Sequence, residues 1–410
     1  MGSGDSPGGP EPGPGGAEPG PAGGPPRVST YLYPWDVVGD PDAASRLVSA
    51  GFRHVVLAAA YHSVRAATPR HPRHRFVLAE TAALYRPARQ GVWAGRRLCP
   101  LEAPWAGAED SFAQAVRFLE AAGLRVSAWV VLTHNSALGR RQRDLVVRNC
   151  FGDSYEWALC PANEEVREYA ALLSAEAVRG LALEGISLEA CGQLGAEHGG
   201  HHEKSAGAYT PLASQILSIC CCDACRRAWS VQGLDPGATV QALREASEIA
   251  QHEAGAGATP EDCLGAPLAA QLLACRQRHA DALLEQVHGE LHDSGVRPRI
   301  SLHAQSDPWA TGASPGLTPT SAQRAEAVLV PVDPTSARSG EVIAAARRSV
   351  PAGVKVAAYV NLLGPVEPAE FGAHAGRLIE AGPDELHLYH FGLANDKQLA
   401  LFSALASMSS

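Results

Sequence analysis

Short runs of aliphatic and β-branched residues alternate along the chain with Ala-rich segments whose apolar residues recur at helical spacing. Such runs are typical of strands buried on both faces in a parallel sheet, and the amphipathic segments between them are typical of connecting helices. Because each run is followed by a helical segment, the pattern predicts a single (β/α)8 TIM barrel. The eight runs lie at residues 27–37, 52–63, 124–135, 183–190, 296–305, 326–334, 354–364 and 384–393.

An open, doubly wound α/β sheet is the alternative fold. It commonly carries G-x-G-x-x-G after its first strand, and neither this motif nor a P-loop is present. We therefore expect one barrel domain over 27–410, with a helical, Cys-rich insertion at 206–296 after the fourth strand. Residues 1–26 are almost entirely Gly, Pro, Ala, Ser and acidic residues, so they are expected to form a disordered tail.

Charge and composition narrow the range of partners. The formal net charge is -9 and no basic block occurs, so nucleic acid is not an expected partner. No apolar run reaches the ~18 residues of a membrane span, and no signal peptide is apparent. A cytoplasmic location follows as the expectation. Only three of the 34 basic residues are Lys, a bias typical of a GC-rich, actinobacterial-type genome.

Polar and aromatic side chains cluster where these runs end. Active sites of (β/α)8 barrels lie at the C-terminal ends of the strands. Aromatic faces stack on sugar rings, and amides and imidazoles hydrogen-bond to hydroxyl groups, so this inventory favours a carbohydrate pocket. The alternative is that the same side chains only cap the barrel layers. The residues expected to line the pocket are Trp35, Asp36, Tyr61, His62, His134, Asn135, His303, Asn361, Tyr389 and His390, with Tyr33 beside them.

Glu189 is the strongest catalytic candidate because it ends the fourth apolar run. Desolvation of a carboxyl group raises its pKa towards the range of a general acid. A structural ion pair with a nearby Arg is the alternative. Glycoside hydrolysis needs a second carboxyl group. We expect Asp333, at the end of the sixth run, to be that partner, with Asp36, Glu197 and Glu203 as rivals.

The loop EHGGHHEK (197–204) follows the fourth run and gathers histidines and carboxylates. Imidazole and carboxylate together also suit Zn, Mn or Fe, although the spacing matches neither H-E-x-x-H nor H-x-H. A metal held by Glu189, His202, His303 and Asp333 is one alternative, and a solvated polar loop is another. We expect this loop to contact substrate through His202, Glu203 and Lys204.

Four of the ten cysteines lie in the segment CCCDAC. This grouping favours reduced thiols over a disulfide framework. Cys220, Cys222 and Cys225 form C-x-C-x-x-C at the start of a helical segment, a spacing that can surround a tetrahedral metal. Cys160 or Cys191 would supply the fourth ligand of a structural zinc site. The alternative is that the thiols pack as small apolar side chains.

Several of these motifs resemble those of known proteins. LCPANEEVREYAALL (159–173), GISLE (185–189) and CCCDACRRAW (220–229) resemble segments of clan-A glycoside-hydrolase-like (β/α)8 proteins, and the cysteine spacing is similar to the structural zinc cluster of thermophile-type β-galactosidases. AAYHS, ATPRHPRHRFVLAETAALYRP, LTHNSALG and HGGHHEKSAG resemble an uncharacterised set of actinobacterial glycosyl hydrolase-like, alanine-rich proteins. One departure matters: clan-A retaining enzymes usually have Asn-Glu at the fourth strand end and Glu at the seventh, where this chain has Leu188 before Glu189 and ends the seventh run with Asn361.

The resemblance and the residues together imply a glycoside hydrolase that acts on a small soluble glycoside or oligosaccharide, with Glu189 and Asp333 as the catalytic pair. A metal-dependent sugar isomerase or hydrolase on the same barrel is the second expectation. A catalytically inert sugar-binding barrel is the third. The partner expected in each case is a small carbohydrate, and the sequence predicts no oligomeric state.

Overall fold

The structure is a computed structural model that describes residues 1, 26–198, 203–205, 207–364 and 368–408. Residues 2–25 of the predicted tail and His202 of the predicted contact loop lie outside the described residues.

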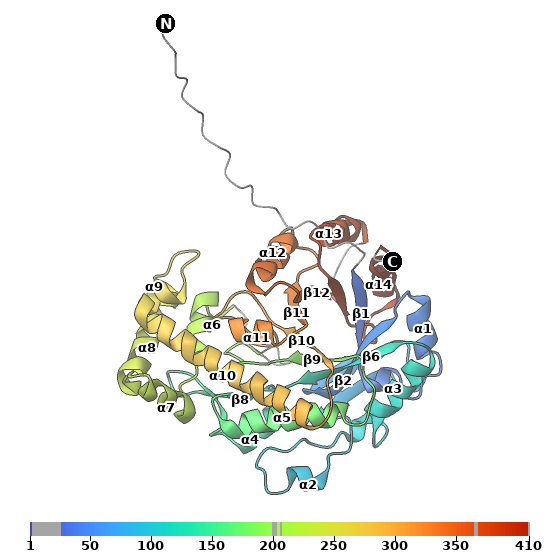
Figure 1. Cartoon of the computed structure of the whole chain (residues 1–410), viewed down its shortest axis with the longest axis horizontal. Coiled ribbons are helices and arrows are strands. Elements are labelled where there is room, and N and C mark those ends of the chain that lie inside the picture. The colour runs from blue at the N-terminus through green and yellow to red at the C-terminus, as the bar shows by residue number, and fades with distance from the viewer. Residues whose placement is uncertain (2–25, 199–202, 206, 365–367, 409–410) are drawn as a thin grey trace.

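Eight parallel strands form a closed barrel (Figure 1). The last strand pairs with the first, where Thr30 lies opposite Leu388, and this pairing closes the ring. The barrel predicted from the alternating pattern is therefore confirmed, and the open sheet is excluded. The strands are β1 (Arg27–Leu32), β2 (His54–Tyr61), β6 (Arg125–Val131), β9 (Gly185–Glu189), β10 (Arg299–His303), β11 (Ala327–Val332), β12 (Lys355–Asn361) and β13 (Glu385–Tyr389).

Helices surround the barrel, and a helix follows every strand before the next one begins. Phe112 and Leu119 on the inner face of α3 are fully buried, and the N-terminus of the helix is capped by Asp110, which accepts a bond from the Ala113 amide at 3.0 Å. Outside the connection after β9, the helices that follow the strands are α1 (Ala43–Ser49), α3 (Ser111–Ala121), α5 (Glu164–Val178), α11 (Pro319–Gln323), α12 (Ser339–Ser349), α13 (Pro368–Glu380) and α14 (Asp396–Met408).

Two connections contain elements that the sequence pattern did not predict. The first, after β2, holds the hairpin β3 (Val64–Ala67) and β4 (Phe76–Ala79), the short strand β5 (Ala83–Leu84) and α2 (Gln90–Trp93). The second, expected to be a polar loop after β6, holds α4 (Ser136–Arg141) and the hairpin β7 (Val146–Arg148) and β8 (Ser154–Leu159). The turn of this hairpin uses Gly152 at φ 101°, a conformation that glycine adopts readily.

Five helices occupy the long connection between β9 and β10, and they gather at one side of the barrel (left in Figure 1). Proline follows the N-cap of α6 and of α8, and the caps Thr210 and Asp235 accept bonds from backbone amides. The longest helix packs along α5 through buried leucines. The five are α6 (Pro211–Leu217), α7 (Asp223–Val231), α8 (Pro236–His252), α9 (Pro260–Leu264) and α10 (Ala266–Asp293).

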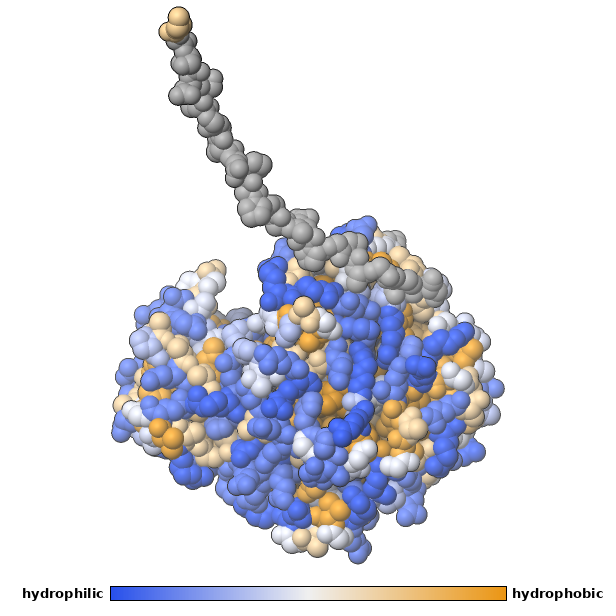
Figure 2. Space-filling view, in the orientation of Figure 1, coloured by the Kyte–Doolittle hydropathy of each residue, from blue (hydrophilic) through white to orange (hydrophobic). Residues whose placement is uncertain are grey.

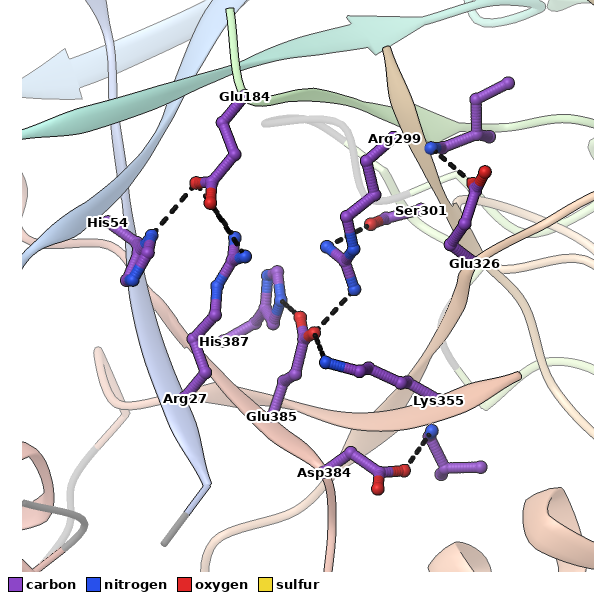
Figure 3. Close-up of polar contacts among 12 residues, drawn as sticks. Arg27, His54, Glu184, Arg299, Ser301, Glu326, Lys355, Asp384, Glu385 and His387 are labelled. Carbon is purple, nitrogen blue, oxygen red and sulfur yellow. Dashed lines mark hydrogen bonds and ion pairs between the residues drawn. The ribbon is translucent and has the colours of Figure 1, made fainter. Parts of the chain in front are cut away.

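The N-terminal ends of the strands carry a network of charged side chains across the barrel floor (Figure 3). The carboxylate of Glu184 accepts hydrogen bonds from the two terminal guanidinium nitrogens of Arg27 at 3.0 and 3.2 Å. Its Oε2 also lies 2.9 Å from His54 Nδ1. Glu385 is fully buried and pairs with Arg299 at 2.5 Å and with Lys355 at 3.7 Å. These contacts join strands from opposite sides of the barrel, so the floor is held by charge pairs and not by apolar packing alone.

The face of the molecule in Figure 2 is mainly hydrophilic, with scattered hydrophobic patches. None of the helices in the described part of the chain is long and apolar enough to cross a membrane.

Candidate active site

Glu189 lies at the C-terminal end of β9, where the strand pattern placed it, and points into the barrel mouth. The residue is 6% exposed, and its Oε2 accepts a hydrogen bond from the indole Nε1 of Trp129 at 2.8 Å. Burial raises the pKa of Glu189 to about 7, although the Trp129 bond opposes this rise. The carboxyl group can therefore hold or release a proton near neutral pH.

Aromatic side chains from five other strands surround this carboxyl group. Trp129 of β6 packs against Tyr31 and Tyr61, with ring centroids 4.9 and 4.3 Å apart. Tyr359 of β12 and Tyr389 of β13 complete the wall, 5.8 Å from each other. Burial, and then the nearby charge of Glu189 among other groups, raise the pKa values of Tyr31, Tyr61 and Tyr359. The mouth is thus an aromatic enclosure around one ionisable carboxyl group.

A row of rings in contact with one another extends from this enclosure along the mouth. His62 lies 4.0 Å from Tyr61 and 4.5 Å from His134, measured between ring centroids. His134 Nε2 is 3.0 Å from His198 Nε2, and the ring of His198 stacks on Trp157 at 4.8 Å. Burial lowers the pKa values of all three histidines, that of His62 to about 4, so the imidazoles are neutral hydrogen-bonding groups at pH 7.

Asp333, the predicted partner of Glu189, is exposed at the end of β11. Its Oδ1 accepts bonds from the amide and the hydroxyl of Thr335 at 2.8 and 2.7 Å, and these bonds lower its pKa. The carboxylate stabilises the turn that leads to α12. No hydrogen bond, ion pair or electrostatic contact of the described residues links it to Glu189.

Asp36, a rival for the same role, is buried against the backbone of Gly392, where an added Cβ would lie 2.1 Å from its Oδ2. Its Oδ2 accepts a bond from the Tyr33 amide at 2.8 Å, and burial raises its pKa to about 7. The side chain anchors the 3₁₀ turn after β1. Of the other two rivals, Glu197 is exposed in the loop after β9, and Glu203 accepts a bond from Ser205 at 2.6 Å.

The remaining predicted residues divide into two groups. His62, His134, Asn361 and Tyr389 are at least partly exposed around the mouth, Tyr61 lies in its wall, and Lys204 is exposed in the loop after β9. The others serve the interior: Trp35 and His390 stack on Tyr33, Asn135 caps α4 and bonds to Tyr169, and His303 bonds to Ser187 and Tyr31 beneath the mouth.

Four residues that contribute to the mouth were not predicted from the sequence: Tyr31, Trp129, Tyr359 and His198. The signal for the first three is the two-residue period of a strand. Tyr31, two residues before Tyr33, and Tyr359, two residues before Asn361, share the inward face of their strands with residues that were recognised. His198 carries no such signal because it lies in a loop.

The four cysteines Cys160, Cys220, Cys222 and Cys225 are buried together, with all four sulfur atoms within 4.8 Å of one another. Cys160 directly follows β8, and the other three lie at the start of α7. The Sγ of Cys160 is 3.7 Å from that of Cys225 and 3.8 Å from that of Cys222. A tetrahedral Zn²⁺ with Zn–S bonds of about 2.3 Å requires sulfur separations of about 3.8 Å, so the cluster could hold such an ion.

Cys191, the other candidate for the fourth ligand, lies next to Glu189, whose charge adds to burial in raising the pKa of the thiol. Among the described residues, the cysteine cluster is the one group of three or more His, Cys, Asp or Glu side chains with ligand atoms close enough to share a metal ion. The geometry therefore gives no support to a metal held by Glu189, His303 and Asp333.

Solved structures with the same barrel include several carbohydrate-active enzymes. The chain is similar to α-L-fucosidase isoenzyme 2 from Paenibacillus thiaminolyticus (TM-score 0.53, 11% identity, 93% of this chain and 49% of that one). It is also similar to the β-galactosidase from the psychrophilic Marinomonas ef1 (0.55, 9%, 93% and 59%). The catalytic domain of the β-amylase from Paenibacillus polymyxa matches over 94% of this chain and 98% of its own, with a TM-score of 0.54 and 13% identity.

Likeness at identities this low shows that the fold is shared. It does not show that the activity is shared. The chain spans about half of the fucosidase and about three fifths of the galactosidase. No protein-family model and no curated protein sequence matches it. The resemblance to actinobacterial, alanine-rich proteins therefore stays a prediction.

Proposed function

We propose that the protein is a glycoside hydrolase in which Glu189 donates a proton to the glycosidic oxygen of the leaving group. The observation that carries this proposal is the buried carboxyl group, with a pKa of about 7, inside an aromatic enclosure at the barrel mouth. A proton donor works best when its pKa lies near the working pH. Aromatic walls suit the C–H faces of a sugar ring, and the barrel is shared with a fucosidase, a galactosidase and an amylase.

The described residues of the mouth would divide the work of binding and proton transfer. Tyr61, Tyr359 and Tyr389 offer ring faces and hydroxyl groups to a sugar, and the neutral imidazoles of His62 and His134 offer hydrogen bonds. Trp129 fixes the Glu189 carboxyl group through the indole N–H. Asp333 keeps its predicted role as the second carboxyl group, although its hydrogen bonds lie within its own turn. In this proposal the cysteine cluster holds a structural zinc, and the cytoplasmic location stays a prediction.

A series of aryl glycosides with leaving groups of different pKa tests the role of Glu189. We expect Glu189→Gln to reduce kcat/KM by about 10²- to 10⁴-fold for poor leaving groups, which need the proton, and much less for good ones. Asp333→Asn is the matched comparison, because that change removes a carboxylate from the rim without touching the enclosure. Its activity should stay close to that of the wild type if the side chain only stabilises its turn.

Two outcomes would contradict the proposal. Equal turnover by wild type and Glu189→Gln across the whole series would remove the carboxyl group from the chemistry. Binding of sugars without any turnover would instead identify an inert sugar-binding barrel. A large loss in Asp333→Asn, with unchanged thermal stability, would support Asp333 as the catalytic partner.

A further inference from the structure

A cavity of about 1140 Å³ lies beside the barrel mouth. Its walls come from the β7–β8 hairpin, the loop after β9, and helices α6 and α8 of the insertion. It is open to solvent and large enough for more than one sugar ring. None of the roles proposed above for the mouth uses it.

The described charged residues of the cavity wall, apart from histidines, are all acidic. Asp153, Glu197, Glu203 and Glu248 line the cavity, and none of the described lining residues is Lys or Arg. Among the described residues, two of these carboxylates form ion pairs with histidine alone: Glu203 lies 3.8 Å from His198, and Glu248 lies 3.7 Å from the exposed His252. Carboxylates grouped in this way repel one another, and a cationic ligand would relieve that repulsion.

One arginine near this wall contacts the hairpin turn. The guanidinium of Arg244 stacks over Phe151, with its carbon 5.6 Å from the ring centroid, and its Nε donates to the carbonyl of Cys150 at 2.8 Å. Arg244 therefore supports the hairpin turn and is not itself a lining residue of the cavity.

The same wall carries surfaces for a sugar. The rings of Phe151 and Tyr209 are about half exposed, at 48% and 51%. Ser214 of α6 is 8% exposed and lines the cavity, and none of the described residues makes a hydrogen bond to its hydroxyl group. This hydroxyl group is free to bond to a hydroxyl or amine of a ligand in the cavity.

The cavity and the barrel mouth share one wall. His198 lines the cavity, and its Nε2 contacts His134, which belongs to the ring row that begins at Tyr61. The cavity therefore lies beside the ring row that leads from Tyr61, a wall residue of the Glu189 enclosure.

We propose that this cavity is a second sugar subsite that takes a residue bearing a primary amine, so that the substrate of this chain is an amino-sugar oligosaccharide. The proposal rests on the proposed hydrolase function. The protonated amine pairs with Glu197 and Glu248, the sugar ring stacks on Tyr209, and Ser214 accepts or donates a bond to the same residue.

Binding can be tested apart from catalysis in the Glu189→Gln protein. The probes are the β-1,4-linked glucosamine tetramer and its fully N-acetylated counterpart, titrated by calorimetry at low salt and about pH 6. We expect the amine form to bind at least about tenfold more tightly, and raising the salt to shrink this difference. Adding Glu197→Gln or Glu248→Gln should weaken binding of the amine form about two- to fivefold each. Glu245→Gln, the same change on the same helix but outside the cavity, should leave it unchanged.

Equal affinity for the two tetramers, or no effect of Glu197→Gln and Glu248→Gln, would overturn the subsite. Turnover by the wild-type protein separates this failure from failure of the hydrolase. If the amine tetramer binds through these carboxylates but is never cleaved, the subsite is supported and the hydrolase function is contradicted. If neutral glycosides are cleaved with no preference for amines, the hydrolase function is supported and the amine subsite is contradicted.

Discussion

The ionisation of Glu189 is set by two opposing contacts. Burial among aromatic rings disfavours the carboxylate, and the indole N–H of Trp129 stabilises it. Because its pKa is about 7, the group is protonated below neutral pH and ionised above it. A proton donor with this pKa makes the reaction sensitive to alkaline pH.

We therefore expect kcat/KM to fall as the pH rises through about 7. Trp129→Phe removes the bond that favours the charged form, so this alkaline limb should move up by about one pH unit. Trp93→Phe, at a buried tryptophan far from Glu189 in the chain, is the control and should leave the limb in place. A limb that stays fixed in Trp129→Phe would mean that a different group titrates in the profile.

The sequence located Glu189 because a carboxylate at the end of an apolar run is rare without a role or a partner. The pairing of Glu189 with Asp333 stays a prediction, because strand position alone does not give the direction of a side chain. At the end of β11 the chain turns, and the carboxylate accepts hydrogen bonds from the amide and the hydroxyl of Thr335, two residues later. An Asp followed by Pro and Thr is itself a turn signal, and this could have predicted the outcome.

At the scale of elements, the cysteine cluster joins the β7–β8 hairpin to the start of α7. The Cys221 amide donates to the carbonyl of Arg148 at 2.6 Å, and the Arg148 amide donates to the Sγ of Cys220 at 3.4 Å. These contacts fasten one wall of the cavity to the helical insertion. A metal bound by the four cysteines would cross-link the hairpin to α7 and stabilise this attachment.

Protein purified from zinc-supplied medium is expected to contain about one metal ion per chain by elemental analysis. Cys222→Ser should lose that metal and lower Tm by about 5–10 °C, because a structural metal contributes several kcal/mol to folding. Cys275→Ser, a buried cysteine outside the cluster, should keep the metal. Metal-free wild-type protein whose Tm does not respond to added zinc would show that the thiols only pack together.

The same hairpin explains a limit of the sequence prediction. β7 has three residues and its partner six, too short for a clear two-residue period, and both lie next to a helix of six residues. The parallel strands were found because they are uniform apolar runs at regular intervals. Elements this short obtain their stability from tertiary contacts, which a single sequence does not reveal.

At the scale of the whole molecule, the stability of the fold depends on the ionisation of Glu184 and Glu385 in the barrel floor. Burial alone would raise the pKa of Glu385, but the hydrogen bond from His387 and the charges of Arg299 and Arg27 outweigh it and lower the pKa to about 2. Burial would also raise the pKa of Glu184. The hydrogen bond from His54 and the charge of Arg27 outweigh this effect and lower the pKa to about 2. Both groups bind protons more weakly in the folded state than in the unfolded state, where the pKa is near 4.5.

The stability that these two carboxylates contribute is therefore complete above about pH 4.5 and is lost as the pH falls towards about 2. Glu385→Gln should lower the free energy of unfolding at pH 7 by about 2–3 kcal/mol, and by much less at about pH 3. Urea unfolding at both pH values measures this difference, with the exposed Glu380→Gln as control. Equal losses at the two pH values would show that shape, and not charge, is what Glu385 provides.

The closing seam of the barrel has a consequence for synthesis of the chain. β1 pairs with β13, and Thr30 bonds to the carbonyl of Leu388, 358 residues later. While a ribosome is still making the chain, β1 has no partner on one side, and each newly emerged strand also presents an open edge. Open edges of this kind pair readily with other chains. The ring can form only after its final strand leaves the ribosome, so β1 keeps one open edge until residues 385–389 have been made.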